Sequence, residues 1–273
     1  MSLINFTLIF IFATALLAVA FIWGFQTYGI YHFSRSDPSR SSNLPERVRA
    51  VQFRSSDGQM IGVRLAMPKP GKPVVISFYG NGADVDLSFN RLHALRELGY
   101  GMAMMEYRSS GATAGKPSEM NFARDALAFY DQLDVLMGQE VSASNRVLHG
   151  FSLGAGVGSR LAAERPFAAV VFEAAPYRTC LYYQDRFRGI PLCWLMWAER
   201  YDVIDHVRRI DAPKLFVHGA LDEALPVARA RILFKEAPAP KEYLEIPQGH
   251  HADLDKFGLA DAMDSFISRN VGL

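Results

Sequence analysis

The sequence predicts an α/β domain, built on a mostly parallel sheet, that follows an N-terminal transmembrane helix. From about residue 46 onward, short apolar runs alternate with amphipathic segments, which is typical of strands and helices that take turns along the chain. The apolar runs indicate about eight strands, and we expect helices on both faces of the sheet. The first 34 residues, in contrast, contain no Asp, Glu, Lys or Arg.

The N-terminal segment 3–25 is apolar with few polar interruptions. As a helix, its roughly 23 residues would span about 34 Å, which is enough to cross a bilayer. A cleaved signal peptide is the alternative, because Ala18-Val19-Ala20 is a small-x-small cleavage signature. We favour an uncleaved anchor, since no Lys or Arg precedes the run and hydrophobic residues continue beyond Ala20.

The segment that follows indicates how the anchor ends. Its aromatic residues are typical of an interfacial belt: Trp23, Phe25, Tyr28, Tyr31 and Phe33. Four arginines come next and place the soluble domain on the cytoplasmic side by the positive-inside rule: Arg35, Arg40, Arg47 and Arg49. We therefore divide the chain into an anchor (1–33), a linker rich in Ser, Arg and Pro (34–45) and a domain (46–273). A chain that starts near Ser41 is expected to be soluble and active.

The period of the apolar residues places the strands and helices of the domain. We expect strands at residues 48–53, 61–67, 74–79, 101–106, 146–149, 168–173, 214–218 and 243–246. We expect helices at residues 87–98, 121–137, 153–164, 227–235 and 259–268. A short turn at residues 55–58 joins the first two strands, so the sheet should begin antiparallel and continue parallel.

A candidate nucleophile lies in Gly150-Phe151-Ser152-Leu153-Gly154, between an expected strand and an expected helix. A turn this tight strains the backbone of its central residue, and the glycines remove Cβ atoms that would clash. The Ser152 hydroxyl is then exposed at a helix N-terminus, where the Leu153 N–H can stabilise an oxyanion. A chance match in a Gly-rich segment is the alternative, and the flanking strand and helix argue against it.

A serine nucleophile needs a base, and a carboxylate that orients the base. Asp222 follows the seventh expected strand, and His250 and His251 follow the eighth. Asp222 could instead cap the next helix. The two histidines and Asp253 could instead hold a metal, but adjacent histidines point apart, and we expect no metal site.

A second oxyanion donor is expected from the loop after the strand at 74–79. The loop reads Tyr79-Gly80-Asn81-Gly82-Ala83, and its glycines let the backbone approach a substrate oxygen closely. We expect the Asn81 N–H to be the donor, with an ordinary Gly-rich turn as the alternative.

In these motifs the chain resembles the membrane-anchored serine hydrolases of the α/β-hydrolase-domain superfamily, related to the Bem46-like proteins. The resemblance covers roughly residues 49–266 and rests on motifs that occur in the family's order: the oxyanion loop at 75–82, Glu106-Tyr107-Arg108-Ser109-Ser110-Gly111 with Gly115-Lys116-Pro117-Ser118-Glu119, the serine turn at 150–154, the acid loop at 218–226, and His251-Ala252-Asp253. It implies an α/β-hydrolase fold in which Ser152 is the nucleophile, Asp222 the acid and His251, rather than His250, the base.

The chain departs from the family's pattern around the pocket, where Tyr79 replaces a His, Ser109 and Ser110 replace Gly and Tyr, Glu106 replaces Asp, and Ala252 replaces Asn. No triad member is lost, so these changes bear on substrate preference more than on catalysis. An aromatic-rich insertion at residues 176–209 should form a cap that suits an apolar acyl group. Plain packing of its rings onto the core is the alternative.

The amino-acid composition argues against some classes of binding partner. Lys and Arg (29) nearly balance Asp and Glu (28), so the chain has no excess cation field for a nucleic acid. Its two cysteines, Cys180 and Cys193, can form at most one disulfide and cannot build a cysteine zinc site. They do not indicate whether the domain lies in an oxidising or a reducing compartment.

We therefore expect a single-pass membrane protein that hydrolyses a carboxylic ester or thioester with an apolar acyl group, from a small molecule or a lipid, without a cofactor. A serine peptidase of the same fold is an alternative, since a triad does not distinguish an amide from an ester. A catalytically silent membrane scaffold is another, favoured by Tyr79 in the oxyanion loop. The sequence does not indicate the oligomeric state.

Overall fold

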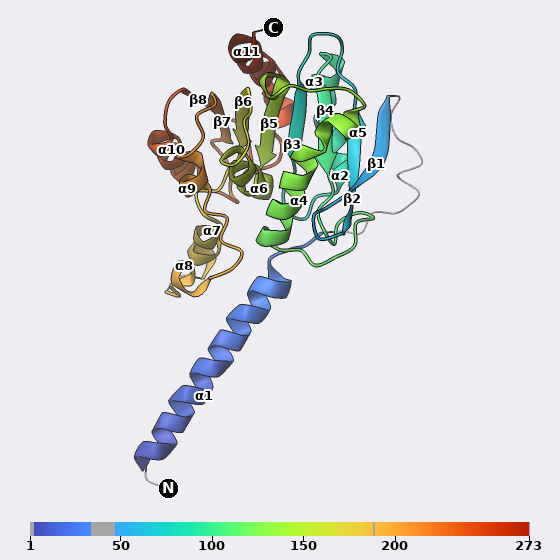
Figure 1. The fold of residues 1–273 in the computed structure, drawn as a ribbon. Helices are drawn as coiled ribbons and strands as arrows, with labels where there is room; N and C mark the ends of the chain where they lie inside the picture. The colour runs from blue at the N-terminus through green and yellow to red at the C-terminus, as the bar shows by residue number, and fades with distance from the viewer. Residues whose placement is uncertain (1–2, 34–46, 188, 273) are drawn as a thin grey trace.

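The computed structural model describes residues 3–33, 47–187 and 189–272, so the predicted linker at 34–45 lies outside the described residues. The domain contains one eight-stranded sheet (Figure 1), which confirms the predicted α/β architecture. In chain order the strands are β1 (Val48–Arg54), β2 (Met60–Ala66), β3 (Val74–Phe78), β4 (Gly101–Met105), β5 (Arg146–Phe151), β6 (Ala169–Glu173), β7 (Lys214–Gly219) and β8 (Lys241–Ile246).

The strand pairing positions the candidate site residues. The order across the sheet is β1-β2-β4-β3-β5-β6-β7-β8. As predicted, the sheet begins antiparallel, since β2 pairs antiparallel with both β1 and β4, and the remaining pairs are parallel. Parallel strands end at the same edge of a sheet. The segments that follow β5, β7 and β8 therefore meet there, and these segments carry Ser152, Asp222 and His251.

Helices cover both faces of the sheet (Figure 1). Those of the core domain are α2 (Val85–Arg91), α3 (His93–Glu97), α4 (Glu119–Asp131), α5 (Leu133–Met137), α6 (Leu153–Ala162), α10 (Val227–Glu236) and α11 (Leu259–Val271). The helices predicted at 87–98 and 121–137 are each divided in two, because the backbone leaves the helical conformation at Leu92 (ψ 21°) and Gln132 (ψ 6°).

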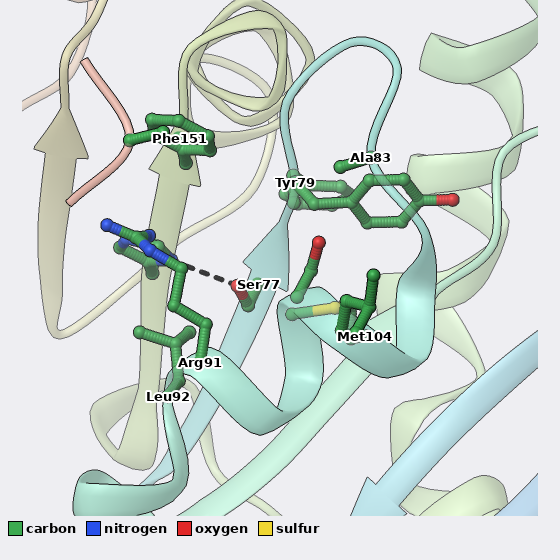
Figure 2. Close-up of a pocket in the computed structure, with 12 residues that line it drawn as sticks. Ser77, Tyr79, Ala83, Arg91, Leu92, Met104 and Phe151 are labelled. Carbon is green, nitrogen blue, oxygen red and sulfur yellow. Dashed lines mark hydrogen bonds between the residues drawn. The ribbon is translucent and has the colours of Figure 1, made fainter. Parts of the chain in front are cut away.

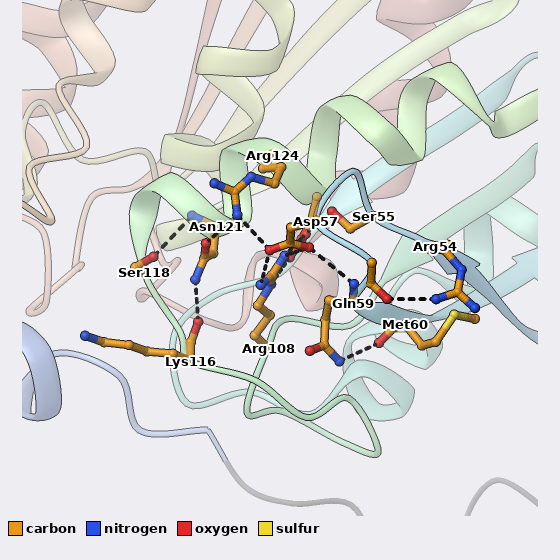
Figure 3. A network of polar contacts seen from close by, with 12 residues as sticks. Arg54, Ser55, Asp57, Gln59, Met60, Arg108, Lys116, Ser118, Asn121 and Arg124 are labelled. Atoms are coloured by element: carbon orange, nitrogen blue, oxygen red, sulfur yellow. Dashed lines mark hydrogen bonds and ion pairs between the residues drawn. The ribbon is translucent and has the colours of Figure 1, made fainter.

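An ion-pair network ties the turn between β1 and β2 to α4 and to the loop after β4 (Figure 3). Arg108 donates hydrogen bonds to the carboxylates of both Asp57 and Asp125, at 2.6–3.0 Å. Arg124 adds a third contact to Asp57 at 2.7 Å. The hydrogen bonds from Arg108 hold the pKa of Asp57 well below its usual value. The network thereby fixes the loop after β4, which packs behind the candidate oxyanion loop.

An insertion between β6 and β7 forms the predicted cap. It contains three helices that the periodicity did not reveal: α7 (Thr179–Arg186), α8 (Leu192–Leu195) and α9 (Val203–Val207). A disulfide between Cys180 and Cys193 joins α7 to α8.

One helix among the described residues is long and apolar enough to cross a membrane. This helix, α1 (Leu3–Gly24), contains no charged residue, and its span Ile4–Gly24 is not buried against the protein. Figure 1 shows α1 projecting away from the domain. A signal sequence would have a similar length and composition, so the helix agrees with either interpretation of the N-terminus.

The chain that leaves α1 packs against the domain, and we call residues 25–33 the exit segment. It starts with a π-helical turn, Phe25–Gly29. Beyond this turn, Ile30 is only 1% exposed. Tyr31 and Phe33 pack their rings edge-on against Phe122, with centroids 5.2 Å and 6.0 Å away. Tyr31 and Phe33, expected in an interfacial belt, instead cover the core of the domain.

Polar contacts fix the same segment. The Tyr31 hydroxyl donates to the Glu199 carboxylate and lies 2.6 Å from the Tyr201 hydroxyl. Both partners belong to the cap region, so the exit segment is held between the core and the cap. A chain that starts near Ser41 would lack these contacts, and its solubility and activity stay a prediction. The aromatic residues against which the exit segment packs come from distant parts of the chain. Hydrophobic periodicity, which is a local pattern, does not reveal such contacts.

Removal of the exit segment should lower the free energy of unfolding. We expect a chain starting at Ser41 to be less stable than one starting at Gly24, which lacks most of α1 but keeps the segment. The loss should be about 3 kcal/mol or more, because burying one large apolar side chain contributes about 1.5–3 kcal/mol. Urea unfolding of both chains in the same detergent buffer measures the difference, and equal stabilities would contradict this account of the packing.

Candidate active site

Ser152 lies in a strained turn between β5 and α6. Its φ of 53° and ψ of −117° are unusual for a residue with a side chain, and its N–H donates to the Glu173 carbonyl at 3.0 Å. The turn requires glycine two residues later, since a Cβ on Gly154 would lie 2.0 Å from the Phe78 carbonyl oxygen. The close approach of α6 to β3 therefore holds the serine at the head of the helix.

The structure brings the three predicted triad residues together. His251 places Nε2 3.0 Å from the Ser152 hydroxyl oxygen and Nδ1 2.8 Å from an Asp222 carboxylate oxygen. His250 faces away and lies 2.7 Å from Glu223 instead. The adjacent histidines thus contact different carboxylates, and only His251 connects a carboxylate to the serine.

The environment of Asp222 keeps this carboxylate ionised. Burial alone would raise the pKa of Asp222, but hydrogen bonds from His218 and His251 outweigh burial and hold the pKa well below its usual value. The N–H groups of Ala224 and Leu225 also donate to Asp222, at 2.8 Å and 2.7 Å. A carboxylate held this way can fix the orientation of the imidazole and stabilise its charged form.

The sequence did not indicate that His218 contacts the candidate acid. This histidine is buried, with Nε2 3.2 Å from the Asp222 carboxylate and 2.8 Å from the Leu225 carbonyl oxygen. His218 therefore supports the far side of the acid loop. Its position directly before the Gly219 turn was the available signal.

The predicted oxyanion donors share a pocket of about 280 Å³ with Ser152 and His251. Leu153 is the first residue of α6, where backbone N–H groups have no partner within the helix. The oxyanion loop approaches the serine closely, since a Cβ on Gly80 would lie 3.4 Å from the Ser152 Cβ. Asn81 and Leu153 therefore lie on the wall of the pocket that holds the serine.

The exit segment forms another part of this pocket, which the sequence did not indicate. Ile30 and His32 line the pocket together with the cap residues Tyr182 and Tyr183. The segment also holds the oxyanion loop: the Asn81 side-chain amide donates to the Ile30 carbonyl at 2.7 Å, and the His32 N–H donates to the Asn81 side-chain oxygen at 3.3 Å. The chain next to α1 thus clamps a candidate oxyanion residue.

Tyr79, which replaces the family's usual His, is directed into the core. Its side chain is 1% exposed, and its hydroxyl donates to the Ser110 hydroxyl at 3.0 Å and accepts from the Tyr107 N–H at 3.0 Å. The Tyr107 hydroxyl donates in turn to the Tyr79 carbonyl at 2.9 Å. Two of the departures from the family's pattern, Tyr79 and Ser110, therefore contact each other and brace the oxyanion loop from behind.

A second cavity, of about 190 Å³, lies beneath the serine turn (Figure 2). His149 bridges the Ser77 hydroxyl (2.9 Å) and the buried Glu173 carboxylate (3.0 Å). Arg91, from α2, pairs with Glu173 and lies over the ring of Phe151, 4.9 Å from its centre. These groups support the strand ends on either side of Ser152. Of these two cavities, the pocket lined by Ser152 and His251 is the better candidate for binding substrate, because the candidate nucleophile lies in it.

The buried Glu173 should make stability depend on acid pH. Burial alone would raise the pKa of Glu173, but Arg91 outweighs burial and lowers the pKa to about 2. Because the folded-state pKa lies below the ordinary value of 4.5, this group stabilises the fold above pH 4.5 and its contribution is lost as pH falls toward 2.

We expect the wild type to lose about 3 kcal/mol from this group over that pH range. Glu173→Gln should be less stable at neutral pH and should show a weaker loss between pH 4.5 and 2, as measured by urea unfolding at each pH. An identical pH dependence in both proteins would show that Glu173 is not the titrating group.

Comparison with known proteins identifies the family. The chain is 31% identical over 262 residues to an uncharacterized protein of Mycobacterium tuberculosis (strain H37Rv), covering 93% of this chain and 92% of the relative. It is 24% identical over 240 residues to human alpha/beta hydrolase domain-containing protein 17B, covering 87% and 81%. No known protein-family model matches the chain.

Solved structures agree on the fold. The Pyrococcus furiosus esterase Pf2001 superposes with a TM-score of 0.69 at 17% identity, over 90% of this chain and 99% of that one. An α/β hydrolase from Penicillium, GrgF, superposes with a TM-score of 0.67 at 17% identity, over 84% of this chain and 100% of that one. These structures show the α/β-hydrolase fold, and with the sequence relatives they place the chain in the family of α/β-hydrolase domain-containing proteins.

Proposed function

We propose that the protein is a membrane-anchored serine hydrolase that cleaves a carboxylic ester or thioester with an apolar acyl group. The observation that carries this proposal is the pair of contacts made by His251, one to the Ser152 hydroxyl and one to the Asp222 carboxylate. The apolar acyl group is inferred from the pocket wall, to which Ile30, Leu153 and Leu225 contribute.

The proposed reaction passes through an acyl-enzyme. Ser152 attacks the carbonyl carbon while His251 Nε2 takes the hydroxyl proton, and the resulting oxyanion accepts hydrogen bonds from the N–H groups of Asn81 and Leu153. His251 then gives the proton to the leaving alcohol or thiol. A water molecule then gives a proton to His251 and attacks the acyl carbon, and His251 returns this proton to the Ser152 oxygen as its bond to the acyl group breaks and the acid leaves. Asp222 keeps the imidazole oriented and stabilises its charged form throughout.

Two alternatives use the same fold. A serine peptidase would need the same triad, since amides and esters pass through the same intermediate. A silent scaffold was favoured by Tyr79, but this side chain is buried away from the pocket and leaves the oxyanion loop unobstructed. The packing of Tyr79 therefore supports an enzyme over a scaffold.

Two features of the chain bear on the side of the membrane on which the domain lies: the charges that flank the anchor and the disulfide. Arginines flanking the anchor, including Arg47 and Arg49, favour the cytoplasmic side. The disulfide between Cys180 and Cys193 favours the opposite side, because disulfides persist mainly in oxidising compartments. The redox state of these two cysteines in intact cells distinguishes the two orientations.

The nucleophile can be tested directly. Wild-type protein should be labelled by a fluorophosphonate probe, and Ser152→Ala should abolish labelling and lower kcat by about 10⁴ or more while the fold is retained. Hydrolysis of p-nitrophenyl esters of increasing chain length, compared with aminoacyl amides, separates an esterase from a peptidase. Full esterase activity in Ser152→Ala, or no labelling of the wild type, would refute the proposal.

The neighbouring histidines provide a matched pair of variants. We expect His251→Ala to reduce kcat to within about tenfold of Ser152→Ala, because its imidazole is the base. His250→Ala should retain most activity, since the His250 side chain lies at the surface beside Glu223. Steady-state kinetics on one soluble ester measures both variants, and the opposite ranking would assign the base to His250.

A further inference from the structure

The cap exposes a group of large apolar side chains, which we call the cap tip: Phe187, Ile190, Trp194 and Trp197. Trp194, on α8, is 91% exposed. Soluble monomeric proteins rarely leave such a cluster in water, and a cluster of this kind usually marks a contact with a partner or a membrane. Tryptophan in particular favours the interface between lipid and water.

The cap tip lies beside the end of α1. The Gln26 side-chain oxygen accepts a hydrogen bond from the Ala198 N–H at 2.9 Å, directly after Trp197. The ring of Phe25 packs edge-on against that of Tyr183 on α7, with centroids 5.1 Å apart. In Figure 1, α8 lies close to the upper end of α1, on the side of the domain from which α1 projects.

This position sets the height of the cap tip relative to a bilayer. Gln26 lies two residues past the end of α1 at Gly24, or about 3 Å further along a helix axis. The polar layer on each side of the hydrocarbon core is about 5–7 Å thick. If α1 spans the core, Trp197 therefore lies within the thickness of the adjacent polar layer.

The cap is also held in this place. The disulfide between Cys180 and Cys193 joins α7 to α8. Cys180 further packs with Ile30 of the exit segment and with Leu192 and Met196 in one buried cluster. The cap tip and the exit segment are therefore parts of one packed unit beside α1.

We propose that the cap tip is inserted into the surface of the bilayer that α1 spans, and that the active site takes its acyl substrate from this bilayer. The pocket supports the second part, because part of its lining comes from the two elements beside the end of α1: Ile30 and His32 from the exit segment, and Tyr182 and Tyr183 from the cap. An acyl chain that enters along these residues would reach Ser152 from the side of the domain on which α1 lies. The second part rests on the proposed hydrolase function, whereas the membrane contact does not.

Tryptophan fluorescence tests the membrane contact without using activity. The chain has three tryptophans, Trp23, Trp194 and Trp197, so variants with Trp→Phe changes can leave any one of them. The vesicles contain lipids that carry bromine near the carboxyl end of the acyl chain. We expect the fluorescence of a variant that keeps only Trp194 to be quenched to a degree similar to that of a variant that keeps only Trp23. Val135→Trp, in a background without other tryptophans, is the control, because Val135 is exposed on α5, away from α1.

The outcomes of this measurement are distinct. Quenching of Trp194 with an unquenched Val135→Trp supports insertion. A Trp194 signal as insensitive to bromine as Val135→Trp, while Trp23 is quenched, would overturn the membrane contact. A soluble protein partner on the cap tip would give this second result.

Activity tests the source of the substrate. Trp194→Glu combined with Phe187→Glu should hydrolyse soluble p-nitrophenyl butyrate at the wild-type rate, because neither residue lines the pocket. Hydrolysis of a long-chain ester held in vesicles should fall by about tenfold or more. Val135→Glu should change neither rate. The membrane route would be overturned if the double variant and the wild type hydrolysed the vesicle substrate at equal rates. It would also be overturned if hydrolysis of the two substrates fell equally, both in the double variant and in Trp194→Ala. Failure of the hydrolase itself would instead leave wild-type protein inactive on both esters and unlabelled by fluorophosphonate.

Discussion

The parallel pairing of β5, β6, β7 and β8 is the constraint on which the candidate site depends. Ser152 and His251 are 99 residues apart in the chain, yet their side chains lie within hydrogen-bonding distance. This is possible because each follows a strand that ends at the same edge of the sheet. The registers of these pairs set the height at which each loop leaves the sheet, and a slip in any of them would separate His251 from Ser152 or from Asp222.

A second layer of contacts holds the loops once the strands have placed them. The serine turn is held by a backbone hydrogen bond to Glu173, whose side chain is in turn held by Arg91 and His149. Behind the oxyanion loop, Tyr79 and Ser110 contact each other. Changing only one residue of that pair would leave a buried hydroxyl without its partner, which is costly. The two departures from the family's pattern therefore make physical sense together.

Much of this arrangement could be predicted from the sequence, because it depends on local signals. Apolar runs of strand length indicated all eight strands, and glycines on both sides of Ser152 indicated the turn. The positions of Ser152, Asp222 and His251, each after a strand of the predicted parallel sheet, predicted that they would meet. These signals can be detected in a single sequence because each depends on the backbone geometry of a short segment and not on contacts with distant residues.

The parts that could not be predicted depend on contacts between distant segments. The helix breaks at Leu92 and Gln132 carry no Gly or Pro to mark them. The cap helices are short, and α8 has only four residues, too few for a helical period to be detected. Tyr31 and Phe33 have the composition of an interfacial belt, and contacts with distant aromatic residues such as Phe122 place them against the core.

The exit segment links the anchor to the chemistry. A flexible linker of polar residues would make no fixed contacts with the domain, and the structure of the domain would then not depend on the segment that precedes it. Here the segment directly after α1 holds the side chain of Asn81 through Ile30 and His32, while the N–H of Asn81 is the proposed oxyanion donor. Oxyanion stabilisation requires donors that are already in position before the charge develops. The position of the proposed donor therefore depends on the segment that follows α1, so the exit segment and the candidate active site form one structural unit.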